Sequence, residues 1–287
     1  MVEERTGMQG SRTLAEALKK SFDVMSPSEK KVARALIAEY PVAGLEPVVK
    51  LAERASVSAP TVFRMLAKVG IQSYPRMQEI LREEIALRTT SPIDQYEAMG
   101  EGSGAEHGVL GSAKDVFVGG ITSSFAAVPS SEFDQVVRLL ADPKRCIWTV
   151  GGRYSSLVAE YLSIHLRLLR PGVRHVGRSE SDKSLALLDF GPRDVLVAFD
   201  YRRYQETTVS FVARAKERRV STVLFTDPWL SPAAKCADYL VSSSVEAPSP
   251  FDSLVPALAL AETVVAGVVA QLGPEPLGRV QAFDEWE

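Results

Sequence analysis

The sequence contains few of the residues that bind metals or form disulfides. It has 2 cysteines and 3 histidines among 287 residues. Cys146 lies in an apolar strand-like run and Cys236 among small residues, so we expect two free thiols rather than a disulfide. His107, His165 and His175 are scattered without the spacing of metal ligands. We therefore expect no disulfide, no metal site and no cofactor.

Long uninterrupted apolar runs are also missing. The longest, residues 254–272, is broken by Pro256, Glu262 and Thr263, and the opening Met-Val-Glu-Glu-Arg lacks the apolar core of a signal peptide. We expect no membrane span and a cytoplasmic protein. With 46% hydrophobic and 24% charged residues, the composition is typical of a globular chain long enough for two domains.

Positive charge is concentrated in the first part of the chain. Residues 1–90 hold 14 Lys and Arg against 11 Asp and Glu, a net charge of +3, whereas the whole chain carries −3. Residues 47–76 have one acidic residue, Glu53, and five basic ones: Lys50, Arg54, Arg64, Lys68 and Arg76. Such a cluster is most often a solvated surface, but combined with a helix pair it is typical of nucleic-acid binding.

Residues 51–64 have the pattern of a helix-turn-helix motif. Val48, Leu51, Ala52 and Ala55 recur at the spacing of one helix face. A short break at residues 56–58 follows. Ser58 is suited to N-cap the second helix through its hydroxyl, with proline in the first turn. The pattern predicts two short helices joined by a tight turn.

The second helix of this motif is the predicted DNA reader. With Val62, Leu66 and Val69 facing inward, its outer face offers hydroxyl groups, a ring and cations, which suit phosphates, thymine methyl groups and guanine edges. The candidate DNA contacts are Lys50, Ser58, Ala59, Thr61, Phe63, Arg64, Lys68 and Tyr74. The predicted partner is double-stranded DNA.

The rest of the chain divides into a helical part, a linker and a second domain. Residues 14–25 have helical spacing, residues 26–29 (Ser-Pro-Ser-Glu) form a capping-box pattern, and residues 73–85 are amphipathic. Residues 91–112 are polar and contain five glycines from Gly100 to Gly111, which predicts a flexible linker. We therefore expect a helical DNA-binding domain at 1–90 and a second domain at 113–287.

The second domain alternates strand and helix patterns. Strand-like runs at 145–150, 194–199, 219–225 and 238–241, with a weaker one at 173–176, alternate with helical patterns at 155–169, 205–218 and 251–272. This alternation predicts an α/β fold with a doubly wound parallel sheet. The predicted fold is thus multidomain, an all-α bundle followed by an α/β domain whose ligand lies at the carboxyl ends of the strands.

Two strand ends carry residues suited to an anion. The first, Gly151 to Ser156, is a glycine turn that opens a helix, whose N–H groups and serine hydroxyls can hold an anion, although such a turn also needs glycine for steric reasons. The second, Asp200 to Gln205, contains two arginines; an interface, or an ion pair with Asp200 or Glu206, is the alternative. The candidate ligand contacts are Gly151, Gly152, Arg153, Ser155, Ser156, Asp200, Arg202, Arg203 and Gln205.

Both parts resemble the RpiR/MurR family of bacterial transcription regulators. The helical part resembles the family's DNA-binding domain at residues 25–33 (Met-Ser-Pro-Ser-Glu-Lys-Lys-Val-Ala), 51–64 and 69–75 (Val-Gly-Ile-Gln-Ser-Tyr-Pro). The second part resembles the sugar isomerase (SIS) domain in its glycine-serine turn and at residues 215–217, 226–227, 231–234 and 248–254. The resemblance implies a homodimer or homotetramer on a palindromic operator, with a phosphorylated sugar as effector.

The chain departs from the family in both strand-end loops. Asp200, Arg202, Arg203 and Gln205 stand where the family has serine, serine, glycine and threonine, and Arg153 replaces a glycine. We therefore expect a small anionic effector, a sugar phosphate or a sugar acid, bound in a different pose and without catalysis. The alternatives are a SIS domain that only dimerises and, less favoured, a phosphosugar isomerase, for which Asp200 and Glu206 lack a histidine partner.

Overall fold

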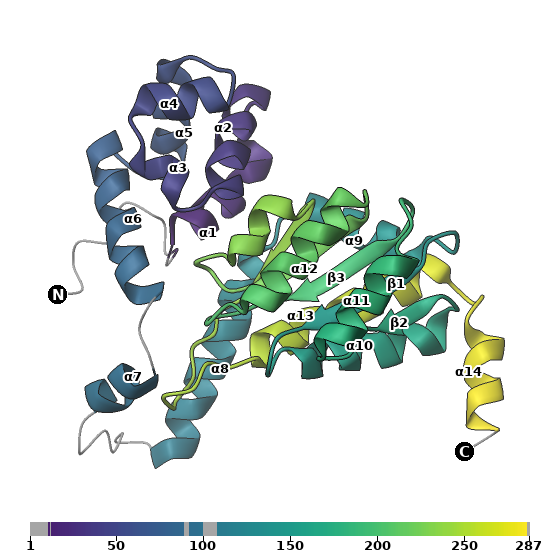
Figure 1. Ribbon diagram of the computed structural model, residues 1–287. Coiled ribbons are helices and arrows are strands. Elements are labelled where there is room, and N and C mark those ends of the chain that lie inside the picture. Colours follow the sequence, from purple (N-terminus) through teal and green to yellow (C-terminus); the bar gives the residue numbers. More distant parts are fainter. Residues whose placement is uncertain (1–10, 12, 89–91, 100–107, 286–287) are drawn as a thin grey trace.

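A computed structural model describes residues 11, 13–88, 92–99 and 108–285 (Figure 1). Its first part is helical, as predicted from sequence. The elements there are α1 (Leu14–Lys20), the 3-10 turn η1 (Phe22–Val24), α2 (Pro27–Ala38), α3 (Val42–Leu45), α4 (Val48–Arg54), α5 (Ala59–Lys68) and α6 (Tyr74–Arg88). We call this part the helical domain.

The helical domain is held by one apolar core and by specific caps. Leu18, Leu36, Leu51, Met65 and Leu81 are almost completely buried in that core. The predicted capping box opens α2, since Ser26 and Glu29 each accept the other's backbone N–H. The single helix predicted over residues 14–25 is wrong, because α1 ends at Lys20 and a separate 3-10 turn follows.

The predicted helix pair is present as α4 and α5. Ser56 takes a left-handed backbone, with φ of 52°, and Val57 N–H donates to Ala52 O at 3.0 Å, which closes the turn between the helices. Ser58 occupies the N-cap position, but its side chain makes no capping bond. The expectation of a hydroxyl cap is therefore wrong, because Ser58 Oγ pairs instead with Thr61 Oγ1 at 3.2 Å.

The segment predicted as an irregular linker contains helices. Helix α7 covers Pro92–Met99, and α8 (Gly108–Ala127) begins before the predicted end of the linker at residue 112. The prediction of irregular structure is wrong for these residues; residues 89–91 and 100–107 lie outside the described part. Helix α8 packs on both α1 and α13 (Val255–Leu272), which explains why a glycine-containing segment forms a long helix.

The second part is the predicted parallel α/β domain. Its five strands lie in the order β2-β1-β3-β4-β5, and every neighbouring pair is parallel. The strands are β1 (Ile147–Gly151), β2 (Val173–His175), β3 (Val195–Phe199), β4 (Ser221–Thr226) and β5 (Tyr239–Ser242). All five predicted strands are therefore confirmed, with ends shifted by one or two residues.

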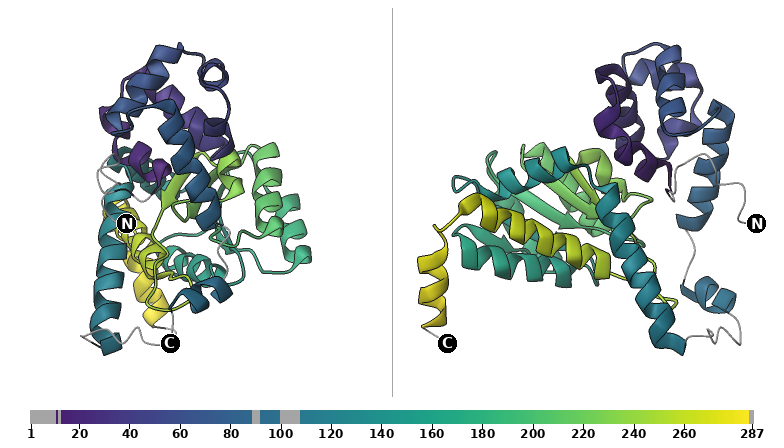
Figure 2. Two further views of the ribbon diagram at one scale, coloured as in Figure 1. Left: turned by 90° about the vertical axis from the view of Figure 1, so that its left-hand side faces the viewer. Right: turned by 180° about the vertical axis from the view of Figure 1, so that it is seen from behind.

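Helices cover both faces of this sheet, as the views in Figure 2 show. Helices α11 (Glu180–Asp189) and α12 (Glu206–Glu217) and the 3-10 turn η2 (Pro232–Cys236) cover one face, against Trp148 and Leu196. Helices α9 (Ser130–Ala141), α10 (Ser156–Leu169) and α13 cover the other, against Ile147 and Val197. A final helix, α14 (Leu277–Asp284), packs on α10. Three of these helices, α9, α11 and α14, were not predicted.

Helix α13 is long and apolar enough to span a membrane by length and composition, and it is the one such helix in the described residues. Leu260, Val264 and Val268 nevertheless lie fully inside the core of the α/β domain. The helix also packs against α9 and α10. The position of one side of the helix in the core thus accounts for that part of its apolar composition.

Candidate functional site

The strand order places a topological switch point between two loops, and we call this place the crevice. Strands β1 and β3 are neighbours, but β1 leads into α10 on one face of the sheet and β3 into α12 on the other. Ligands of such sheets bind at this point, outside the carboxyl ends of the strands. The loops that flank it are residues 151–156 and 200–205, the two predicted from sequence.

The first loop is a tight turn fixed by its own serine. Ser155 Oγ donates to Phe199 O at 2.7 Å and accepts the Gly152 N–H at 2.9 Å. Gly151 is required by close contact, since a Cβ there would stand 2.4 Å from Ser156 N. Ser155 therefore closes the turn and ties β1 to β3, whereas the exposed Arg153 makes neither contact.

Asp200 in the second loop is engaged within the protein. The residue is only 1% exposed and accepts hydrogen bonds from Ser231 Oγ and from Gln205 N–H. Burial raises the pKa of the Asp200 carboxyl to about 6, although the bond from Ser231 acts in the opposite direction. The alternative in which Asp200 pairs with an arginine of its own loop is wrong.

Substituting Asp200 with asparagine should change how stability depends on pH. Because the folded pKa of about 6 exceeds the ordinary value of 3.8, the wild-type carboxyl binds its proton more tightly when folded, and the free energy of unfolding falls as pH rises from 4 to 6. The Asp200→Asn protein should lack this fall and be more stable above pH 6 by up to about 3 kcal/mol. Urea unfolding between pH 4 and 7.5 measures the difference. A constant difference across this range would contradict the assignment.

The two arginines of the second loop do not form a cationic hole. Arg202 pairs with Asp252, lies 4.3 Å from the centre of the Trp229 ring and donates to Leu87 O at 3.3 Å. Arg203 is exposed. The expectation that both arginines converge on the crevice is therefore wrong: Arg202 is neutralised by a carboxylate that lies fifty residues away in sequence.

Two other cations lie beside the crevice, and sequence reasoning missed both. Arg178 Nε donates to Ser156 Oγ at 2.7 Å, and Lys183 Nζ donates to Thr207 Oγ1 at 2.9 Å. Arg178 precedes α11, whereas Lys183 lies within α11, is only 5% exposed and also lies 3.5 Å from Glu180 Oε1. The capping box between Ser179 and Asp182, visible in the sequence, opens α11 and would have located this segment.

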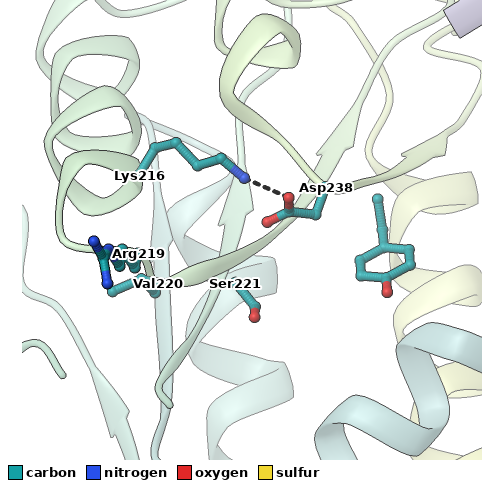
Figure 3. A pocket seen from close by; sticks show the side chains of 6 residues that line it. Lys216, Arg219, Val220, Ser221 and Asp238 are labelled. Atoms are coloured by element: carbon teal, nitrogen blue, oxygen red, sulfur yellow. Dashed lines mark hydrogen bonds and ion pairs between the residues drawn. The ribbon is translucent and has the colours of Figure 1, made fainter. Parts of the chain in front are cut away.

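A pocket lies at the opposite edge of the sheet, at the amino ends of β4 and β5 (Figure 3). Its volume is about 400 Å³, and it is lined by Lys216, Arg219, Val220, Ser221, Asp238 and Tyr239. Lys216 pairs with Asp238, so that these two charges cancel. This pocket was not predicted, and it is separate from the crevice, which lies at the carboxyl edge.

The predicted DNA contacts fall into exposed and buried groups. Phe63 is 46% exposed, and Lys50, Ser58 and Arg64 are also exposed, whereas Ala59 is half-buried. Thr61 is only 4% exposed and bonds to Ser58 and Arg64, so its placement on the outer face is wrong. Tyr74 is likewise buried, because its hydroxyl donates to Glu46 O at 2.8 Å and anchors α6.

Most cations of the motif are ion-paired within the helical domain. Lys68 lies 2.9 Å from Glu29, the third helical residue of the α2 capping box, and also donates to Val24 O. Arg54 pairs with Glu39 and Glu46, Lys50 with Glu53, and Arg76 with Glu79 and Glu83. Arg64 is the exception among the described residues, since it donates only to Thr61 Oγ1 at 2.9 Å. Arg64 is thus the cation of α5 best placed to meet an external anion.

The α/β domain is a SIS domain. The SIS family model matches residues 139–266, a range that includes all five strands and both loops of the crevice. No curated protein matches the sequence.

Solved structures of similar fold include bacterial regulators. The sugar isomerase domain of an RpiR transcription factor from Sphaerobacter thermophilus is 20% identical, with a TM-score of 0.58 over 61% of this chain and 98% of that one. NanR from Vibrio vulnificus, solved with ManNAc-6P, is 18% identical, with a TM-score of 0.53 over 95% of this chain and 97% of that one. A proposed sugar-phosphate isomerase from Listeria monocytogenes is 17% identical, with a TM-score of 0.51 over 60% of this chain and 93% of that one. These likenesses establish the fold.

Proposed function

We propose that this protein is a cytoplasmic transcription regulator that binds double-stranded operator DNA through α5 and senses a small anionic metabolite through its SIS domain. The observation that carries the proposal is the joining of a helix-turn-helix, whose second helix exposes Phe63 and Arg64, to a SIS domain with cations beside its crevice. The whole-chain likeness to NanR supports it, because that likeness extends over 95% of this chain and so includes both domains.

The proposed effector is a sugar phosphate or a sugar acid. Its anionic group would meet the start of α10, where Arg178 donates to Ser156, and Lys183 of α11, which donates to Thr207 of α12. NanR was solved with ManNAc-6P, a phosphorylated sugar, which favours this class. The proposal includes no catalysis, because Asp200 is held by Ser231 and Gln205 and is not available as a general base.

The proposed active form is a homodimer or a homotetramer. Large apolar side chains are exposed on the neighbouring helices α8 and α13, among them Val118, Phe125 and Val269. An exposed group of this kind is typical of a surface that another chain covers. Two copies of α5 would then read the two halves of a palindromic operator.

Replacing Arg64 with alanine should weaken DNA binding without destabilising the protein. A duplex bound by the wild-type chain is first selected from a random library. Loss of Arg64 should lower affinity for it about tenfold, the effect expected for one base contact, or reduce the salt dependence by about one unit if the contact is to phosphate. The matched control is Arg82→Ala, which removes an exposed arginine from α6 and should leave affinity unchanged.

Selection from the DNA library tests the proposed DNA binding, and a panel of ligands tests the proposed effector binding. Failure to select any duplex, or equal affinities of the Arg64→Ala and wild-type proteins, would remove α5 as the DNA reader. Sugar phosphates, sugar acids and the parent sugars are compared by calorimetry and by the shift in melting temperature. If none of them binds, the SIS domain is a dimerisation module; if aldose and ketose phosphates interconvert, the protein is an isomerase.

A further inference from the structure

The helical domain rests on the loops after β3 and β4 of the SIS domain. Thr13 Oγ1 donates to Pro228 O at 3.0 Å, and the Arg88 guanidinium lies 4.6 Å from the centre of the Tyr204 ring. The bond from Arg202 to Leu87 O joins the same loop to the end of α6. We call this contact the dock; it is formed by Thr13, Lys19, Leu87 and Arg88 on the helical domain and by Glu132, Arg202, Tyr204 and Pro228 on the SIS domain.

The dock holds the helical domain as a unit. Leu14 N–H, at the start of α1, donates to Glu84 Oε1 on α6 at 2.7 Å, so the two helices that meet the SIS domain are tied to each other. On the other side, Asp227 accepts hydrogen bonds from Arg202 N–H, Tyr204 Oη–H and Trp229 N–H. The β3 and β4 loops therefore present one connected surface to the two helices.

Several buried polar atoms in the dock lack partners. Among the described residues, Lys19 Nζ and Glu132 Oε2 are buried without a hydrogen bond, and so is Trp229 Nε1 beside Pro228. Burial lowers the pKa of Lys19 to about 8, although the charge of Glu132 acts in the opposite direction. Unpaired buried polar groups regain hydration when a contact opens. The dock is thus built to open at small cost.

The loop that forms the dock also covers the crevice. Gln205 follows Tyr204 directly, and its N–H is fixed to Asp200. A methyl group on Gly152 would stand 3.3 Å from Gln205 Oε1 and 3.5 Å from Ser155 Oγ, so the Gln205 amide lies over the Gly152 backbone. In the proposed site, an anion at the Gly152 backbone would compete with this side chain for the same space.

We propose that the dock and an anion in the crevice exclude each other, so that the effector releases the helical domain from the SIS domain. The role of this release in regulation rests on the proposed function. The exclusion itself is between two contacts of the loop at residues 200–205, one with the helical domain and one with the anion. A ligand that binds only the undocked form shifts the chain toward that form, and a variant that opens the dock binds the ligand more tightly.

The test uses the full chain with inorganic phosphate as the probe and no DNA. Amide hydrogen exchange over residues 14–20 reports the dock, and calorimetry gives the phosphate affinity. Arg88→Ala should speed exchange and tighten phosphate binding about fivefold, at the lower end of typical coupling. Lys19→Met, which removes a buried cation and leaves Glu132 without its counter-charge, should likewise speed exchange and tighten phosphate binding. The matched control is Arg82→Ala, which removes an exposed arginine of α6 outside the dock. Its exchange rate and phosphate affinity should equal those of wild type.

The results test the dock, the exclusion and the role of α5 separately. Equal exchange in wild type, Arg88→Ala and Lys19→Met would overturn the dock. Altered exchange with unchanged phosphate affinity, or with no phosphate binding in any variant, would overturn the exclusion. Failure to select a duplex, or equal DNA affinities of the Arg64→Ala and wild-type proteins, would instead refute the role of α5, and it leaves both of these readouts unaffected.

Discussion

Replacing Gly151 with alanine should destabilise the SIS domain by about 3 kcal/mol or more. The added Cβ would stand 2.4 Å from Ser156 N, 2.5 Å from Ser156 Cα and 2.6 Å from Ser155 C. All three are backbone atoms, so no side-chain rotation relieves the contact, and the start of α10 must move away from β1. That movement would also shift Ser156 and its partner Arg178. Urea unfolding, followed by circular dichroism, measures the loss.

The matched control for this substitution is Gly119→Ala. Gly119 lies within α8, and a Cβ there would meet nothing within 4 Å. Alanine favours a helix over glycine by about 1 kcal/mol, so this variant should be as stable as wild type or slightly more stable. Equal stabilities of the Gly151→Ala and Gly119→Ala proteins would show that the turn after β1 yields easily and that its close packing does not require glycine.

Replacing Arg170 with methionine should cost about 3 kcal/mol in the free energy of unfolding. Arg170 is buried, and its guanidinium donates to Leu140 O at 2.8 Å, to Asp142 O at 2.6 Å and also to Arg145 O. Methionine fills much of the same volume but donates no hydrogen bond. The loop between α9 and β1 would therefore keep several carbonyl groups without a partner.

The control for this prediction is Arg167→Met on the same helix region. Arg167 is exposed, so its replacement should change stability by less than about 0.5 kcal/mol. The two variants are compared by urea unfolding at neutral pH. If Arg170→Met is as stable as Arg167→Met, burial of the guanidinium costs as much as its four hydrogen bonds to carbonyl oxygens contribute, and Arg170 does not stabilise the loop.

The sequence predicted most of the fold because local patterns coincided with tertiary packing. Runs such as residues 194–199 carry apolar side chains on both faces, the pattern of a parallel strand that is covered by helices on both sides. The capping box at Ser26 marked the start of α2. Helix α8 was missed because its glycines and serines disfavour a helix locally. Its stability depends on packing against α1 and α13, which no local pattern reveals.

The positions of the two loops at the ends of β1 and β3 were predicted, but the partners of their side chains were not. Both loops of the crevice follow from the strand order, which the alternation of patterns implies. The partners of individual side chains do not, since Arg202 finds Asp252 and Lys68 finds Glu29 across long stretches of sequence. Spacing predicts which face of a helix a residue occupies, but a long charged side chain reaches whatever carboxylate the fold brings near it.

The bond between Lys68 and Glu29 would have a mechanical consequence for the proposed reading of DNA. It fastens the last turn of α5 to the first turn of α2, while Tyr74 fastens α6 to the backbone at Glu46. These contacts favour movement of the helical domain as one body if the dock opens as proposed. A rotation near α1 would then displace Arg64, and in the proposed dimer the two displacements would set which distance between operator half-sites the protein accepts.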